Sequence, residues 1–333
     1  MNGTMTAAVC TRYGGPEVVE ISNNHPIPEI GSGDLLVEVH ATTVNRTDCA
    51  YRAARPLFMR LLTGLRTPRH SVWGTEFAGR VVATGSEVSE FAVDDRVFGY
   101  CEGKFGAHAQ YIAVAADSGV ARIPAGVTYP VAAAATEGAH YALSFVERAQ
   151  LADAERVLVN GATGGIGSAA VQILKSSGVE VTAVCGGDHL DLVRGLGADR
   201  VIDYTTTDFT ESAGDYDAVL DAVGKSTFRR CRPLLRPGGI YASSELGPWC
   251  QNLFLALWTR RRSGPKVVFP APLEGRGIVL RIAGLLENGQ FRPVIDRHYP
   301  LDRIAEAYRY VETGTKIGNV VIDVAAGGPR GTS

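Results

Sequence analysis

The sequence lacks a hydrophobic run long enough to span a membrane and a basic run long enough to follow a nucleic-acid backbone. The longest apolar run in its C-terminal third, LFLALW at 253–258, is far shorter than the ~20 residues that cross a bilayer. The densest basic cluster is TRRRSGPK at 259–266, and the formal net charge is only −2. We therefore expect no membrane span and no nucleic-acid partner. The N-terminal residues show no basic segment followed by an apolar one, so we expect a cytoplasmic protein.

The sequence also lacks closely paired cysteines. Its six cysteines contain no C-x-x-C pair and are scattered, at Cys10, Cys49, Cys101, Cys185, Cys231 and Cys250. Such spacing is typical of reduced thiols in a cytosolic protein rather than of a disulfide framework. Structural zinc usually needs closely paired thiolates or imidazoles, so we expect no such site.

The length and the pattern of the chain indicate two domains. A single hydrophobic core stops growing at roughly 250–300 residues, and this chain has 333 residues, of which 45% are hydrophobic. The first 125 residues alternate as strands do, for example in LLVEVHATTVN at 35–45. From about Tyr129 onward helices and strands alternate, which predicts an α/β fold with a doubly wound parallel sheet. The last strand, NVVIDV at 319–324, is expected to return to the first domain.

Two helices in this pattern have defined expected limits. PVAAAATEGAHYALSFVERAQ at 130–150 is rich in alanine and predicts one helix. DRIAEAYRYVETG predicts a helix that begins at Asp302 and ends at Gly314, because aspartate favours helix starts and glycine favours helix ends.

The most specific motif is a glycine-rich loop between a buried strand and a helix, in RVLVNGATGGIGSAAVQILKSSG at 156–178. An A-x-G-x-x-G pattern places Ala162, Gly164 and Gly167 at the turn. Glycine lets the backbone turn tightly and approach a pyrophosphate, whose negative charge the amides at the helix N-terminus then face. The sequence therefore predicts dinucleotide binding by Gly161, Ala162, Thr163, Gly164, Gly165, Ile166 and Gly167.

The end of the next strand bears on the choice between NADP and NAD. NAD-binding proteins commonly carry an acidic residue there that binds the ribose hydroxyls. This strand ends in VCGGDH at 184–189, where Gly186 and Gly187 leave room for a 2′-phosphate and His189 follows. We expect NADPH rather than NADH, and Asp188 turned toward the ribose would reverse that preference.

Eight stretches of the chain carry a resemblance to a known family. They are HATTVNRTD at 40–48, GTEFAGRVVATGSEV at 74–88, DRVFGY at 95–100, VLVNGATGGIGSAAVQ at 157–172, LGADRVIDY at 196–204, YDAVLDAVG at 216–224, LRPGGIYAS at 235–243, and RPVIDRHYPLDRIAEAYRYVETGTKIGNVVI at 292–322. In this order they resemble the medium-chain dehydrogenase/reductase superfamily, and more closely its zinc-free quinone oxidoreductase branch. The resemblance implies a GroES-like β-rich catalytic domain at 1–125 and 273–333, and a Rossmann domain at 126–272. It also implies an active-site cleft between the two domains and a homodimer.

The zinc ligands of the zinc-dependent members are missing from this chain. Those members carry a cysteine where this chain has Asn45 and a histidine where it has Thr75, and their loop of four cysteines is absent here. Asparagine and threonine are poor ligands for zinc, which prefers thiolate and imidazole. We therefore expect no zinc.

The absence of zinc ligands favours reduction of an activated acceptor. Zinc stabilises an alkoxide, so its loss disfavours alcohol oxidation. A quinone or an α,β-unsaturated carbonyl is already electron-poor: hydride attacks the β-carbon, and the enolate needs only hydrogen-bond donors and a proton. We predict an NADPH-dependent, zinc-independent reductase of quinones or enones. Two alternatives stay open, an NADP-dependent alcohol or carbonyl dehydrogenase and a non-catalytic NADPH-binding regulatory protein.

The resemblance also suggests individual site residues. Asn45 is expected beside the nicotinamide ribose, where it orients the cofactor or the substrate oxygen, and capping its own turn is the alternative. Tyr51 is a candidate hydrogen-bond donor to the substrate, although the family's tyrosine falls one residue earlier, at Ala50, and a partly buried surface tyrosine is the alternative. Thr136 is expected to face the nicotinamide, and Tyr204 to flank the adenosine phosphate. Strand ends at the expected cofactor edge supply Ala222, Val223, Gly224, Ser243 and Ser244, for which plain packing is the alternative.

Two apolar segments lie outside these motifs. PWCQNLFLALW at 248–258 predicts an apolar helix face suited to a pocket wall, a dimer contact or a core. RPLFMRLLTGLRTP at 55–68 is apolar and basic, and we expect it to cover the cleft. Such a cover indicates a hydrophobic small-molecule substrate.

Overall fold

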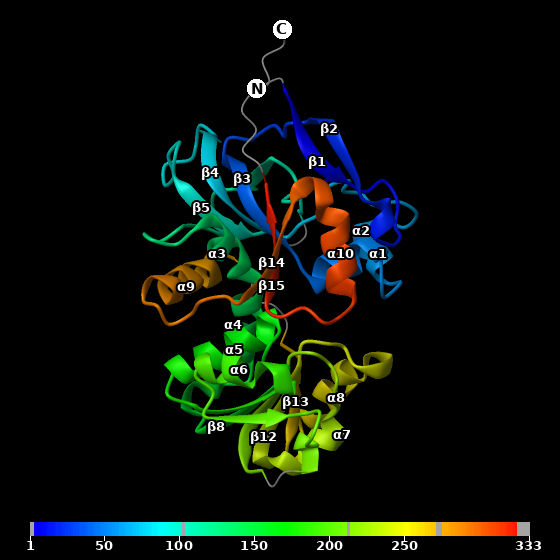
Figure 1. Cartoon of the computed structure of the whole chain (residues 1–333), viewed down its shortest axis with the longest axis vertical. Coiled ribbons are helices and arrows are strands. Elements are labelled where there is room, and N and C mark those ends of the chain that lie inside the picture. Colours follow the sequence, from blue (N-terminus) through cyan, green and yellow to red (C-terminus); the bar gives the residue numbers. More distant parts are fainter. Residues whose placement is uncertain (1–2, 102–103, 212–213, 271–274, 325–333) are drawn as a thin grey trace. The chain divides into compact units, whose positions relative to one another are not determined.

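A computed structural model gives the structure of the chain and describes residues 3–101, 104–211, 214–270 and 275–324. The chain forms two compact units (Figure 1). Unit 1 comprises Met1–Thr136, Glu274–Glu287 and Ile295–Ser333, and unit 2 comprises Glu137–Leu273 and Asn288–Val294. Compared with the expected domain limit at residue 125, unit 1 extends to Thr136.

Unit 1 is built around a mainly antiparallel sheet. Within the described residues its strand order is β14-β15-β3-β4-β5-β7, and β6 also pairs with β3. These strands are β3 (Asp34–Val44), β4 (Glu76–Thr84), β5 (Arg96–Tyr100), β6 (Tyr111–Ala115), β7 (Val120–Arg122), β14 (Ile295–Pro300) and β15 (Asn319–Asp323). The pairing of β15 with β3 is antiparallel, which confirms that the last strand returns to the first domain.

The other elements of unit 1 surround this sheet. They are β1 (Thr4–Val9), which pairs with β2 (Glu20–Pro26), and the helices η1 (Pro16–Val18), α1 (Arg46–Ala53), α2 (Met59–Thr63), α3 (Tyr129–Ala134), α9 (Arg276–Glu287), η7 (Leu301–Arg303) and α10 (Ile304–Glu312). Helix α1 begins where β3 ends, because Asn45 and Asp48 form a capping box that satisfies backbone amides at the helix start.

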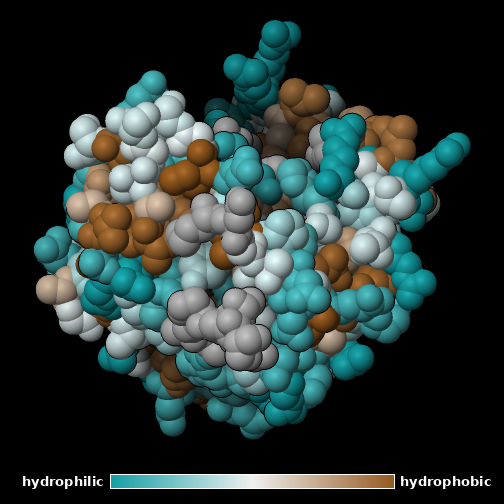
Figure 2. Space-filling model, turned by 90° about the horizontal axis from the view of Figure 1, so that it is seen from above, coloured by the Kyte–Doolittle hydropathy of each residue, from teal (hydrophilic) through white to brown (hydrophobic). Residues whose placement is uncertain are grey.

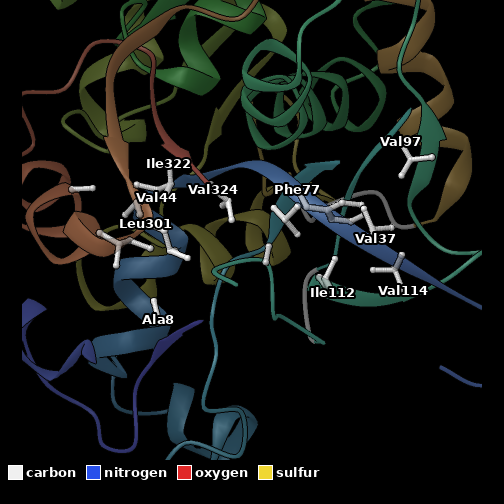
Figure 3. Close-up of a cluster of buried hydrophobic side chains, with 14 of the residues drawn as sticks. Ala8, Val37, Val44, Phe77, Val97, Ile112, Val114, Leu301, Ile322 and Val324 are labelled. Atoms are coloured by element: carbon white, nitrogen blue, oxygen red, sulfur yellow. The ribbon is translucent and has the colours of Figure 1, made fainter. Parts of the chain in front are cut away.

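An apolar core joins strands that are distant in the sequence. Figure 3 shows the side chains of Val37, Phe77, Ile112 and Val114 gathered on one part of the sheet, and Val44 near Ile322 on another. On β6 the alternation of strand side chains places Ile112 and Val114 on the same face. Helix α10 adds Ile304, Ala307, Tyr308 and Val311, whose spacing defines one helix face.

The limits of α10 correct the sequence prediction at one end. Asp302 lies in the short helix η7, and α10 begins two residues later at Ile304. The cap residue is Arg303, which makes no side-chain capping bond, so packing of the apolar face rather than an aspartate cap sets this start. Gly314 has a φ of +72° and follows the helix end, as predicted.

Unit 2 contains the predicted parallel sheet. Its strand order within the described residues is β10-β9-β8-β11-β12-β13, and these pairings are parallel. The strands are β8 (Arg156–Asn160), β9 (Glu180–Cys185), β10 (Arg200–Asp203), β11 (Tyr216–Asp221), β12 (Leu235–Ser243) and β13 (Lys266–Val268). The doubly wound parallel sheet and the α/β class are thereby confirmed.

Helices connect the strands of unit 2. They are α4 (Thr136–Arg148), η2 (Leu151–Asp153), α5 (Gly165–Ser176), η3 (Gly187–His189), α6 (Leu190–Gly195), η4 (Phe209–Glu211), α7 (Phe228–Cys231), η5 (Arg232–Leu234), η6 (Pro248–Cys250) and α8 (Gln251–Thr259). The single helix predicted at 130–150 is wrong, since α3 ends at Ala134 and α4 begins at Thr136. At this break the Thr136 hydroxyl lies 3.1 Å from the carbonyl oxygen of Ala133 and also reaches Glu76.

The surface carries apolar residues in patches. On the face seen in Figure 2, hydrophobic residues (brown) gather in several places between hydrophilic ones (teal). Among the exposed large hydrophobic side chains, two groups are close in sequence: Leu57, Phe58, Leu61 and Leu65, and Trp249, Leu253, Phe254, Leu257 and Trp258. No helix among the described residues has the length and apolarity needed to cross a membrane.

Candidate functional site

The glycine-rich loop of unit 2 connects β8 to α5, as the sequence predicts. The amides of Gly161 and Ala162 both donate to the carbonyl oxygen of Val184 on β9, at 3.1 and 3.0 Å, which draws the loop across the sheet edge. Gly161 has a φ of +81°, a conformation that favours glycine. At two of these positions any side chain would clash with a neighbouring atom. A Cβ atom on Gly167 would lie 2.1 Å from the carbonyl oxygen of Gly161, and one on Gly161 would lie 2.3 Å from a methyl group of Val223.

The N-terminus of α5 has the chemistry of an anion site. Its cap residue is Gly164, which has no side chain to satisfy the first helical amides. Among the residues that the structure describes, a Cβ atom on Gly164 would meet only the carbonyl oxygen of Gly161, at 3.6 Å, so packing within them does not demand glycine there. Unsatisfied amides and the positive end of the helix dipole together favour a phosphate group. The residues of this loop therefore fit the pyrophosphate of a dinucleotide.

A buried aspartate that the sequence did not single out organises the neighbouring strand ends. The Asp221 carboxylate accepts hydrogen bonds from the amides of Gly224 and Ser226, both at 3.0 Å. It also accepts from the Tyr241 hydroxyl at 3.1 Å and from the Asn160 side chain at 3.0 Å. The ends of β8, β11 and β12 are tied together through this one carboxylate. Its signal in the sequence is an acidic residue at the end of an otherwise apolar strand.

Hydrogen bonds at this sheet edge also fix the positions of the strand-end residues that the sequence predicted, at 222–224 and 243–244. The amide of Ala222 donates to the carbonyl oxygen of Asn160 at 3.0 Å, and that of Val223 to Asp221 at 3.3 Å. Gly224 has a φ of +63°. Ser243 is buried and accepts from the amide of Glu245, while the amide of Ser244 donates to the carbonyl oxygen of Asp221. Backbone contacts from 222 to 226 thus lie at the same sheet edge as the glycine-rich loop.

The residues expected near the adenosine lie close together at the ends of β9 and β10. A Cβ atom on Gly186 would stand 3.4 Å from the hydroxyl oxygen of Tyr204, whose side chain is exposed. Gly187, Asp188 and His189 form the short helix η3. Hydrogen bonds from the hydroxyl and amide of Thr205 lower the pKa of Asp203, which keeps a carboxylate beside Gly187.

Unit 1 contains a buried polar network centred on Glu76. One oxygen of its carboxylate accepts a hydrogen bond from the hydroxyl of Thr136, and the other accepts from the hydroxyl of Thr43. The side-chain amide of Asn45 donates to Glu76 and to the Thr75 hydroxyl oxygen, both at 3.3 Å. All five side chains are buried. The network joins the end of β3, the start of β4 and the start of α4.

Asn45 also caps α1, which was the alternative role considered for it. Its side-chain oxygen accepts from the amide of Asp48 at 2.8 Å, and Asp48 accepts from the amide of Asn45 at 3.0 Å. Because the oxygen caps the helix, the side-chain nitrogen is the atom that faces Glu76 and Thr75. The orientation of this amide is therefore fixed.

His108 contacts the network through the backbone of Thr43. Its Nε2 atom lies 2.8 Å from the carbonyl oxygen of Thr43, so Nε2 carries the proton and donates. Its Nδ1 atom then accepts from the Tyr308 hydroxyl at 3.3 Å. Burial lowers the pKa of His108 to about 4, so the ring is neutral near pH 7. Gly74 makes room for this ring, because a Cβ atom there would lie 2.5 Å from its Cδ2 atom.

Tyr51 lies on α1 in a buried aromatic cluster. Its ring is parallel to that of Trp73 at 6.0 Å and meets the edge of Phe105 at 4.8 Å. Such offset and edge contacts stabilise aromatic packing and hold the phenol in place. Asn45 and Tyr51 thus belong to the same helix but to different sets of contacts, one polar and one aromatic.

Asn45 and Thr75, the two positions that the family resemblance assigns to zinc ligands in the zinc-dependent members, carry a different donor set. Asn45 offers an amide and Thr75 a hydroxyl, and the two are hydrogen-bonded to each other. In the part of the chain that the structure describes, no group of three or more His, Cys, Asp or Glu side chains is arranged to hold a metal ion.

Comparisons with known proteins agree with the two-unit fold. Residues 31–125 match the family model "Alcohol dehydrogenase GroES-like domain", and residues 196–322 match "Zinc-binding dehydrogenase". The quinone-oxidoreductase homolog, chloroplastic, of Spinacia oleracea is 30% identical over 313 residues, which cover 89% of this chain and 92% of that protein. The NADPH-dependent alkenal/one oxidoreductase, chloroplastic, of Arabidopsis thaliana is 28% identical and covers 96% of this chain and 79% of its own length.

A solved structure shows the same fold. The quinone oxidoreductase from Coxiella burnetii superposes with a TM-score of 0.83 at 23% identity, covering 96% of this chain and 99% of its own. The β-rich unit 1, the parallel sheet of unit 2 and the matches over both units lead to one assignment. The chain belongs to the medium-chain dehydrogenase/reductase superfamily of pyridine-nucleotide-dependent oxidoreductases.

Proposed function

We propose that this chain is an NADPH-dependent, zinc-independent oxidoreductase that transfers hydride to a quinone or an α,β-unsaturated carbonyl. One observation carries the proposal: Asn45 and Thr75, which the family resemblance puts at the zinc-ligand positions, are hydrogen-bonded to each other and, through Asn45, to Glu76. An amide and a hydroxyl in these roles supply no Lewis acid for an alkoxide. The names of the Spinacia and Arabidopsis relatives support this class of acceptor.

The chain's own residues position the reactants in this mechanism. The cofactor supplies the hydride when bound. The helical amides after Gly164 bind its pyrophosphate, and the backbone around Ala222 to Gly224 lines the same sheet edge. Hydride addition to the β-carbon of an enone moves an electron pair onto the substrate oxygen, and the enolate that forms takes up a proton at its α-carbon; a reduced quinone instead takes up its proton on oxygen. Tyr51 is our candidate donor to that oxygen, and Thr136 is our candidate for the side chain that faces the nicotinamide.

The preference for NADPH is part of the proposal. Gly186 and Gly187 carry no side chain that would exclude a 2′-phosphate, and the exposed Tyr204 hydroxyl beside Gly186 can donate to it. His189 follows on the short helix η3. The Asp203 carboxylate beside Gly187 would repel a 2′-phosphate, so the NADPH preference depends on the hydrogen bond from Tyr204. Tyr204→Phe should raise the KM for NADPH and leave that for NADH unchanged, whereas equal changes in both would contradict the assignment.

A homodimer is also proposed, on the basis of unit 2. Within the described residues β13 pairs only with β12, so its other edge is free to pair. The neighbouring helix α8 exposes Phe254 and Leu257. Replacing both with serine should convert a dimer to a monomer in light scattering after size exclusion, while Val93→Ser, an exposed apolar site in unit 1, should not. A native monomer would refute the proposal.

The experiment that tests the reaction is stopped-flow oxidation of NADPH against quinones, alkenals and cyclic enones, with and without a metal chelator. We expect turnover that the chelator leaves unchanged. Loss of activity with the chelator would refute zinc independence. Turnover of saturated alcohols with NADP⁺ would instead identify an alcohol dehydrogenase, and cofactor binding without turnover of any acceptor would identify a regulatory protein.

A further inference from the structure

The segment from Arg55 to Arg69 exposes apolar side chains that a protein surface rarely leaves in water. Leu57 is 72% exposed, Leu61 is 67% exposed and Leu65 is 66% exposed, and Phe58 is also exposed. Isolated exposed leucines are common, but several large apolar side chains exposed within one short stretch indicate an interaction site. The group comes from one short stretch of unit 1 around α2.

This segment is held in a defined conformation. The Tyr13 hydroxyl lies 2.7 Å from the Thr63 hydroxyl and donates to the carbonyl oxygen of Gly64 at 2.8 Å. The amide of Arg69 donates to the carbonyl oxygen of Thr63 at 2.8 Å. The guanidinium of Arg60 lies over the Tyr13 ring, 5.2 Å from its centre. Thr63 is buried, so the stretch is anchored at its middle while its apolar side chains face outward.

The charges on the segment have one sign. Arg55, Arg66 and Arg69 are exposed. The sequence contains no aspartate or glutamate between Asp48 and Glu76. Arginines that flank exposed apolar side chains are the arrangement by which a protein lies on an anionic lipid surface, where guanidinium groups meet phosphates and apolar groups enter the acyl boundary.

The same charges argue against a second copy of the chain as the occupant. A two-fold interface places identical patches against each other. The arginines of the two copies would then lie close together and repel each other, because this segment supplies no carboxylate to neutralise them. An anionic lipid surface has no such conflict, and it needs no membrane-spanning helix.

We propose that residues Arg55–Arg69 dock the protein on an anionic phospholipid surface, with Leu57, Phe58, Leu61 and Leu65 in the headgroup boundary and the arginines on lipid phosphates. The segment acts as a peripheral contact. The proposal is independent of the reaction assigned above, because its test measures binding and not turnover.

The test is co-sedimentation of the full chain with vesicles of phosphatidylcholine alone, or of phosphatidylcholine and phosphatidylglycerol in equal parts. We expect binding to the anionic vesicles only, weakening as salt is added. Arg66→Gln with Arg69→Gln should weaken partitioning about 30-fold, since each arginine near an anionic surface contributes ~1 kcal/mol. Leu57→Ser with Leu61→Ser should weaken it at least ~10-fold through lost apolar burial.

Matched variants separate this surface from general effects of charge and hydropathy. Arg229→Gln with Arg232→Gln removes the same charge from exposed positions in unit 2, and Leu280→Ser removes an exposed leucine from α9. These controls should bind as the native chain does. Circular dichroism would verify that each variant is folded.

Three results would overturn the proposal. The first is native chain that stays in the supernatant with anionic vesicles. The second is equal weakening by the control arginine pair, which would mean that net charge alone acts. The third is unchanged vesicle binding together with a smaller oligomer for Leu57→Ser with Leu61→Ser, which would assign the surface to a contact between copies.

Discussion

Replacing Glu76 measures how much the buried polar network contributes to the stability of unit 1. The carboxylate accepts from the hydroxyls of Thr43 and Thr136 and from the amide of Asn45. Glu76→Ala would leave the Thr43 and Asn45 donors facing a cavity, whereas the Thr136 hydroxyl can still donate to the carbonyl oxygen of Ala133. Each buried donor that loses its acceptor costs about 1–3 kcal/mol and the cavity adds to that cost, so we expect the free energy of unfolding to fall by ~3 kcal/mol or more.

Glu76→Gln should cost less. The glutamine oxygen can replace the acceptor of Thr43 and Asn45, and its nitrogen can donate to the Thr136 hydroxyl oxygen. That hydroxyl can in turn donate to the carbonyl oxygen of Ala133, 3.1 Å away. The free energy of unfolding should then fall by about 1–2 kcal/mol, because hydrogen bonds to a charged carboxylate are replaced by weaker bonds to a neutral amide.

Urea unfolding followed by circular dichroism would measure both variants, with Glu287→Gln on the exposed side of α9 as the control. An exposed substitution of this kind changes stability by less than ~0.5 kcal/mol. The reasoning is refuted if Glu76→Ala unfolds at the same urea concentration as the control, or if Glu76→Gln is the more damaging of the two.

Two further predictions concern the loop and the buried histidine. Gly167→Ala should abolish NADPH binding in calorimetry and lower the thermal midpoint, because its Cβ atom would lie 2.1 Å from a backbone oxygen. Gly164→Ala should weaken binding and keep the midpoint, since its nearest contact is at 3.6 Å, and equal midpoints for both would contradict the packing argument. Burial lowers the pKa of His108 to about 4 from 6.5, so the unfolded chain binds more protons between these values. Stability should therefore fall by ~3 kcal/mol as pH decreases from about 6.5 to 4, and urea titrations of His108→Gln should show a smaller decrease. A pH dependence unchanged in the variant would exclude His108 as the cause.

Sequence patterns predicted most of the fold but less of the candidate site. Apolar strands alternating with helices predicted the parallel sheet of unit 2, and the last strand returned to the first domain as expected, where NVVID at 319–323 pairs with β3. The break between α3 and α4 was missed, because alanine favours helix on both sides of it. The start of α10 was placed two residues early, because aspartate also occurs in short 3₁₀ turns.

The residues missed in the site are those whose partners are distant in the sequence. Asp221 gathers amides and side chains from three strands, and Glu76 accepts from Thr136, sixty residues away. Asn45 was expected either to contact the cofactor or to cap its turn, and the structure shows that it does cap α1. Its contact with the cofactor stays a prediction.

The sequence by itself determined the glycine-rich loop and the order of helices and strands. Local backbone geometry depends on nearby residues, so a glycine with positive φ between a strand and a helix is visible in the sequence. Only the tertiary structure decided that Glu76 binds two threonines and an asparagine, and that Leu57 and Leu61 stay exposed. The partner of a side chain depends on which distant segments the fold brings together, and the spacing of residues along the chain does not contain that information.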